Sequence, residues 1–154
     1  MYKRVLATLD GSANAECALP YAEDLAKKYG AEVTLLSVAE PLTVKDDELY
    51  IAAAERQLEA AQQILSTNLR GYLSQKEKEL KDKGLEVRSV LLSGKAADQI
   101  VDYASKEGFD LVIMATHGRS GIAKWAYGSV ADKVLRGATN HTMLVRCPVP
   151  GDKV

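Results

Sequence analysis

Short apolar runs alternate with longer amphipathic segments along the whole chain, and this pattern constrains the fold more than any other feature. In the longer segments apolar residues recur every three or four positions, as on the buried face of a helix. Strands that alternate with helices form a parallel sheet with right-handed crossovers and helices on both faces. The sequence therefore predicts one three-layer α/β/α domain over residues 1–154 in the order βαβαβαβαβ. The predicted strands lie at 5–9, 33–38, 87–92, 111–115 and 143–145.

Capping and helix-breaking residues bound the predicted helices. Ser12 can cap the first helix, Gly30 is placed to end it, and Pro20 inside it should bend it or delay its start. The second helix is long, from about residue 47 to 83, and a last helix ends near Gly137.

Composition favours a soluble globular protein and argues against several partners. The 154 residues are 47% hydrophobic and 27% charged, with a formal net charge of −1. That balance offers no general attraction for nucleic acid or for an anionic membrane surface. No apolar run approaches membrane-spanning length, and the N-terminus leads directly into a short strand rather than a signal peptide. We expect the protein in the cytoplasm.

The chain contains two cysteines, Cys17 and Cys147, which lie far apart and form no CxxC pair. This spacing suggests neither a disulfide framework nor a thiolate metal site. The expectation is two free thiols in a reducing compartment.

The most polar, glycine-bearing segment follows the fourth predicted strand. Gly118 and Arg119 lie in it, and after nine further residues Gly128 and Ser129 begin the last helix. Glycines let backbone amides approach an anion, and a helix N-terminus adds unpaired donors and a positive dipole end. These residues, with Lys124, predict a phosphate site. A plain strand–loop–helix connection with Ser129 as an ordinary cap explains them as well.

Asp10 ends the first strand, where ligands of open α/β sheets bind beyond the carboxyl ends of the strands. Its carboxylate could accept hydrogen bonds from a ribose or a base. It could also form an Asx-turn with the Gly11 that follows.

Catalytic and metal-binding patterns are absent from the sequence. The Gly94-Lys95 pair is no Walker A loop, because that motif needs Gly at position 89 and Ser or Thr at 96, where this chain has Ser89 and Ala96. The two histidines, His117 and His141, belong to no HExxH motif and have no cysteine partner. We predict no catalytic residue and no protein-held metal.

The chain resembles the universal stress protein family over nearly its whole length. The likeness includes the opening run at 5–12, the strand at 35–38 and the closing run at 142–146. The nucleotide-binding branch of that family carries the pattern G-x2-G-x9-G-[S/T]. Here Gly118, Gly128 and Ser129 match its later positions, while Ala115 stands at the first, where glycine is usual.

This resemblance implies a Rossmann-like open sheet with strand order 3-2-1-4-5 and an adenine-nucleotide site. The nucleoside would lie among Thr8, Leu9, Asp10, Val38, Met114 and Ala115, and the phosphates against Gly118, Arg119, Gly128, Ser129 and Val130. The ligand implied is ATP, or ADP or AMP, with magnesium held only through the nucleotide.

The resemblance also implies an assembly and a role. A homodimer would form through the last strand, at 143–149, because an unpaired edge strand invites such pairing. The function implied is a stress-response sensor or switch with at most slow ATP hydrolysis. The alternative is a dimeric interaction module of the same family that binds no nucleotide.

Overall fold

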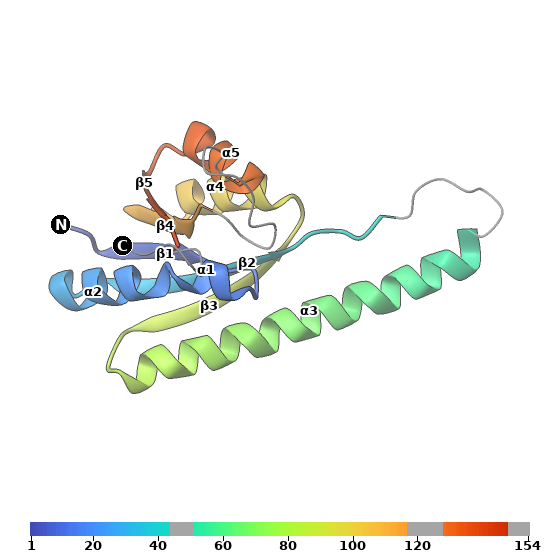
Figure 1. The fold of residues 1–154 in the computed structure, drawn as a ribbon, viewed down its shortest axis with the longest axis horizontal. Coiled ribbons are helices and arrows are strands. Elements are labelled where there is room, and N and C mark those ends of the chain that lie inside the picture. Colours follow the sequence, from blue (N-terminus) through green and yellow to red (C-terminus); the bar gives the residue numbers. More distant parts are fainter. Residues whose placement is uncertain (44–50, 117–127, 148–154) are drawn as a thin grey trace.

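The computed structural model describes residues 1–43, 51–116 and 128–147, and contains a five-stranded parallel sheet in the order β3-β2-β1-β4-β5 (Figure 1). This confirms the predicted fold class and strand order. The strands are β1 (Arg4–Thr8), β2 (Glu32–Ala39), β3 (Val87–Ser93), β4 (Leu111–Ala115) and β5 (His141–Val145). The helices are α1 (Ala13–Glu16), α2 (Leu19–Tyr29), α3 (Ile51–Asp82), α4 (Ala96–Lys106) and α5 (Ser129–Gly137).

Helices cover both faces of the sheet and divide the core into two clusters (Figure 1). Along β1, Val5 and Ala7 pack with residues of α1, α2 and α3, whereas Leu6 packs with residues of α4 and α5. This alternation follows from the two-residue period of a strand. The central strands β1 and β4 are buried on both faces, so both read as continuous apolar runs.

The first crossover contains two helices because Pro20 delays the second. The Ser12 side chain caps α1 by accepting a hydrogen bond from Ala15 N. Pro20 lies in the first turn of α2, where its missing N–H would have no helical partner anyway. Gly30 ends α2 in the left-handed conformation, with φ 64°.

The long helix α3 lies along β2 and β3, and its N-terminal end extends past the sheet (Figure 1). Leu69, Leu73 and Leu80 are the buried residues of its inner face. The prediction placed this helix at 47–83; it spans Ile51–Asp82, and the residues before Ile51 that the prediction included lie outside the described chain. None of the helices in the described ranges is long and apolar enough to cross a bilayer.

The last strand begins earlier than predicted. β5 starts at His141 rather than Met143, because His141 and Thr142 pair with Leu111 and Val112 of β4. This boundary is decided by hydrogen-bonded pairing with β4, which the hydrophobicity of the local sequence does not predict.

The prediction of two free thiols is wrong. Cys17 and Cys147 form a disulfide with their Cα atoms 5.8 Å apart, across a sequence separation of 130 residues. Cys17 caps the C-terminus of α1, and Cys147 follows β5 by two residues. The sheet order brings these distant segments together, which cysteine spacing alone does not reveal.

Candidate functional site

The strand order reverses beside β1, which pairs with β2 on one side and with β4 on the other. The connections leaving β1 and β4 then run to opposite faces of the sheet, so the carboxyl ends of these strands border a crevice. A cavity of about 430 Å³ lies there. This is within the usual range for small-molecule sites.

The first side of the cavity is the turn that follows β1. Leu9 N donates to Leu36 O at 2.8 Å, and Ser37 Oγ donates to Leu9 O at 2.7 Å. Asp10 Oδ1 then accepts from Ser12 N at 2.9 Å and from Ser12 Oγ at 2.5 Å. This Asx-turn, one of the two interpretations of Asp10, is therefore present. It holds the carboxylate at the rim of the cavity.

The opposite side is the start of α5. Gly128 N donates to Thr116 O at 2.6 Å, which ties the helix start to the end of β4. Gly128 is the N-cap and Ser129 the first helical residue, so the alternative interpretation of Ser129 as an ordinary cap is not the arrangement observed. Gly128 has φ −56°, which any residue can adopt. Gly128 therefore matters at the cavity wall because it has no side chain to fill the space.

The helix α5 directs its first backbone N–H groups at this wall, since the first turn of a helix has no internal partners for them. Together with the positive end of the helix dipole, these donors favour an anion. Ser129 is exposed at the cavity and Val130 is half-buried beside it.

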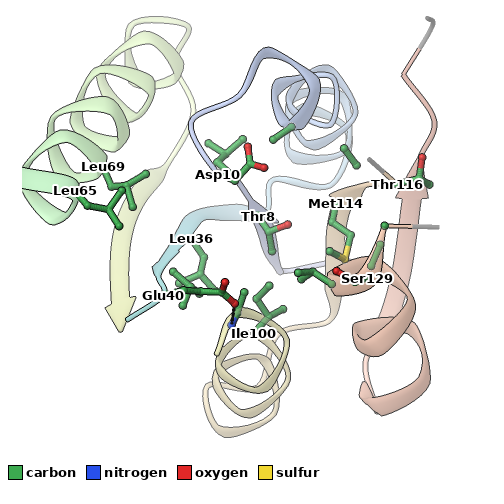
Figure 2. Close-up of a pocket in the computed structure, with 18 of the residues that line it drawn as sticks. Thr8, Asp10, Leu36, Glu40, Leu65, Leu69, Ile100, Met114, Thr116 and Ser129 are labelled. Atoms are coloured by element: carbon green, nitrogen blue, oxygen red, sulfur yellow. Dashed lines mark hydrogen bonds between the residues drawn. The ribbon is translucent and has the colours of Figure 1, made fainter. Parts of the chain in front are cut away.

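The remaining wall is mostly apolar and comes from four elements. Figure 2 shows Leu36, Ile100 and Met114 lining it from β2, α4 and β4. Leu65 and Leu69 of α3 point into the same space from the other side. The cavity thus has an apolar part and a polar part, and the polar part is formed by Thr8, Asp10, Thr116 and Ser129.

Predicted site residues from four separate segments meet around this one cavity. Those that line it are Thr8, Leu9, Asp10, Val38, Met114, Ala115, Gly128, Ser129 and Val130. Ala115, at the position where the family pattern has glycine, pairs with Val145 of β5. Gly118 and Arg119 lie outside the described residues, as do His117 and Lys124.

Several lining residues were not predicted for the site. Leu65 and Leu69 belong to the apolar face of the long helix, and periodicity identifies such a face but not the space that it borders. Leu42 N donates to Gln62 Oε1 at 2.8 Å, which holds the segment after β2 against α3. Glu40 accepts from Ala96 N at 2.9 Å through Oε1 and so satisfies the start of α4. No local sequence pattern predicts these two hydrogen bonds.

A charged cluster joins α3 to α1 beside the cavity. Tyr72 Oη donates to Glu16 Oε1 at 2.9 Å, and Lys76 Nζ lies 3.0 Å from Glu16 Oε2. Burial and the Glu16 carboxylate raise the pKa of the Tyr72 phenol, so the phenol stays protonated at physiological pH. This cluster adds polar contacts to the packing of α3, the helix that carries Leu65 and Leu69 of the apolar wall.

The described residues place no group of three or more His, Cys, Asp and Glu side chains where they could hold a metal ion. The carboxylates among the described lining residues are Asp10 and Glu40, and both hold other groups of the protein. The arrangement is suited to binding a ligand with a flat apolar part and an anionic part.

Comparison with known proteins finds relatives that match nearly the whole chain. The model of the universal stress protein family matches residues 1–146. Universal stress protein MJ0577 of Methanocaldococcus jannaschii is 28% identical over 155 residues, which cover 95% of this chain and 96% of that protein. The solved structure of MJ0577 superposes with a TM-score of 0.81 and covers 97% of this chain and 99% of that chain.

Two further solved structures share the fold. Universal stress protein UspA from Lactobacillus plantarum has a TM-score of 0.82 at 20% identity, and the match covers 94% of this chain and 98% of that one. A universal stress protein in complex with cAMP has a TM-score of 0.64 at 20% identity, covering 94% and 97%. The chain described here belongs to the universal stress protein family.

Proposed function

We propose that this protein binds an adenine nucleotide in the cavity between β1 and β4 and acts as a stress-response sensor or switch. The observation that carries the proposal is the meeting of four distant segments around one cavity with an apolar and an anion-binding side. ATP is the first candidate ligand, and ADP and AMP share its nucleoside and at least one phosphate. We expect the protein to act in the cytoplasm.

The ligand would lie with its base toward the apolar wall. Val38 and Leu36 border that part, and Asp10 stands where ribose hydroxyls could donate to its carboxylate. The phosphates would meet the backbone amides of Ser129 and Val130 at the start of α5, beside Gly128, whose own N–H donates to Thr116 O. Gly118 and Arg119 would complete the phosphate side, and magnesium would be held through the phosphates.

A relative supports the choice of ligand class. A universal stress protein of the same fold is known in complex with cAMP, so this fold can hold an adenine nucleotide. The order of affinities among ATP, ADP, AMP and cAMP is open to direct measurement.

Hydrolysis of ATP would be slow at most. Activation of a water molecule needs a base within hydrogen-bond reach of it. Asp10 and Glu40, the carboxylates among the described lining residues, already accept hydrogen bonds from Ser12 and from Ala96 N. Binding without rapid turnover suits a sensor better than a metabolic enzyme.

The alternative is a dimeric interaction module that binds no nucleotide. The position of β5 favours a dimer, since in the described sheet β5 pairs only with β4 and its outer edge has no strand beside it. A homodimer through 143–149 is compatible with both functions. Nucleotide binding is what separates them.

Thermal unfolding with Mg-ATP tests the proposal. A ligand present at about 100 times its Kd adds about 2.7 kcal/mol, which raises the Tm of a chain of this size by about 5 to 10 °C. We expect this rise for the wild type and its loss in Gly128→Val, whose side chain would occupy the phosphate side.

The matched control is Gly71→Val on the exposed face of α3, where an added Cβ meets no atom within 4 Å. This variant should keep the full rise in Tm. If millimolar Mg-ATP leaves the wild-type Tm unchanged, the interaction module is the better assignment.

A further inference from the structure

The disulfide between Cys17 and Cys147 joins the two sides of the cavity. Figure 1 shows the end of β5 reaching α1, and the bridge links the C-cap of α1 to the segment just after β5. We propose that Cys17 and Cys147 form a reversible thiol–disulfide pair that couples the redox state of the cell to the affinity of the cavity. This inference rests on the proposed nucleotide-binding function.

The Cys17 end of the bridge leads directly to the nucleoside side. Ala15, two residues earlier, is buried and lines the cavity. Ala15 N donates to Ser12 Oγ at 3.2 Å, and Ser12 holds Asp10. A change in the position of Cys17 is therefore transmitted through one short helix to the carboxylate at the rim.

The Cys147 end leads to the phosphate side. Val145, two residues earlier, accepts a hydrogen bond from Thr116 N at 2.9 Å through its carbonyl. Thr116 O in turn accepts from Gly128 N at 2.6 Å, and both Thr116 and Gly128 line the cavity. The bridge thus restrains the turn after β1 and the start of α5 relative to each other.

The backbone oxygen of Asn14 offers a hydrogen-bond acceptor to the reduced form of the pair. Cys147 Sγ lies 2.8 Å from the backbone oxygen of Asn14. A disulfide sulfur has no proton to donate, but a thiol at this place can donate to that oxygen. The reduced pair therefore has a partner in the same fold.

Both cysteines are half-buried, so small thiols and disulfides can reach them. Disulfides in reducing compartments are typically transient and redox-sensing. Oxidised glutathione is a suitable reactant. One cysteine thiolate attacks it, which forms a mixed disulfide and releases one glutathione thiolate. The second cysteine thiolate attacks the protein sulfur of the mixed disulfide and releases the other glutathione, and the two cysteine protons end on the two glutathiones.

The oxidised form is the one that binds nucleotide more tightly. A bridge that restrains both rims removes part of the ordering that a ligand otherwise imposes. We expect reduction to weaken Mg-ATP binding by about fivefold or more, the lower end of usual coupling between sites. By reciprocity, saturating Mg-ATP favours the disulfide over the dithiol by the same factor.

The test titrates the native protein in glutathione and dithiothreitol buffers of graded potential, with and without Mg-ATP. Alkylation followed by mass spectrometry counts the free thiols, and calorimetry measures Mg-ATP affinity in the fully oxidised and reduced forms. The inference is supported if the disulfide is reduced reversibly without denaturant and the reduced form binds Mg-ATP more weakly. Mg-ATP should also shift the midpoint potential of the redox titration. A bridge that opens only in denaturant, or equal affinities in the two forms, overturns the inference.

The variants Cys17→Ser and Cys147→Ser serve as controls. Each should bind Mg-ATP as the reduced wild type does, and oxidised glutathione, which can form only a mixed disulfide with the remaining cysteine, should not raise that affinity. If either variant fails to fold, the wild-type titration still decides the question.

Hydrogen exchange of the ligand-free protein separates failure of this inference from failure of the proposed function. Reduction should speed exchange in α1 and β5. If neither redox form binds a nucleotide, the proposed function fails, while faster exchange still supports the coupling of the bridge to both rims. Binding that is equal in both forms, with unchanged exchange, leaves the proposed function intact and rejects the redox pair.

Discussion

Asp110 ties the start of the chain to the turn before β4. Its Oδ2 accepts from Lys3 N at 2.7 Å and from Arg4 N at 2.8 Å. These two backbone donors lower the pKa of the Asp110 carboxyl. Because the folded pKa lies below the unfolded value of about 4, the stabilisation is complete above that value and is lost as the pH falls through the folded pKa.

Asp110→Asn should therefore destabilise the protein in a pH-dependent way. We expect a loss of about 1 kcal/mol in the free energy of unfolding at pH 7, because a neutral amide is a weaker acceptor than a carboxylate. The difference from wild type should shrink as the pH falls from about 4 through the lower folded pKa, where the carboxyl of the native protein becomes protonated. Urea unfolding at several pH values measures it.

Asp102→Asn, at an exposed position of α4, is the matched control and should change little at any pH. If Asp110→Asn lowers the free energy of unfolding equally at pH 7 and in acid, the stabilisation does not come from the ionised carboxylate.

At the scale of elements, a polar contact joins α1 to α3, the helix that carries part of the cavity wall. The two helices meet through Glu16, Tyr72 and Lys76. Leu69 and Leu65 lie one and two turns before Tyr72 on α3 and form part of the apolar wall. The position of the wall depends on this polar contact as well as on apolar burial.

Tyr72→Phe should loosen that contact without creating a cavity. Loss of the hydroxyl that donates to Glu16 should lower the free energy of unfolding by about 1 kcal/mol. A double-mutant cycle with Glu16→Gln measures the coupling by urea unfolding.

Tyr21→Phe provides the comparison, since Tyr21 is 51% exposed on α2, and it should leave stability unchanged. Strict additivity of Tyr72→Phe and Glu16→Gln would show that the hydrogen bond does not join the helices.

At the scale of the whole molecule, the disulfide closes a loop across nearly the entire chain. The bridged residues are separated by 130 positions. A cross-link over so long a loop restricts the unfolded chain strongly, and such bridges typically add about 2 to 4 kcal/mol of stability. The folded state needs no new contact to gain this stability.

Reduction of the native protein should therefore lower its free energy of unfolding by about 2 to 4 kcal/mol. Urea unfolding with and without reductant measures the difference. The double variant Cys17→Ser, Cys147→Ser should unfold like the reduced wild type and should not respond to reductant. If reductant still lowers the free energy of unfolding of this variant, the loss of stability does not come from the disulfide.

Much of the fold could be predicted because its signals are local. The buried strands β1 and β4 appear as apolar runs, Pro20 marks the start of α2, and Gly30 marks its end. The strand order came from the family likeness rather than from the residues themselves. The cavity was predictable in outline, because Asp10 lies at the end of the first predicted strand and Gly128 at the start of the last predicted helix.

The sequence by itself determined the elements, since strand and helix periods and capping residues are properties of short segments. Only the tertiary structure decided which distant residues meet. The wall formed by Leu65 and Leu69 and the bridge between Cys17 and Cys147 depend on which strands are neighbours in the sheet. Contacts of this kind carry no local signature, because their energy arises only after the chain has brought the two segments together.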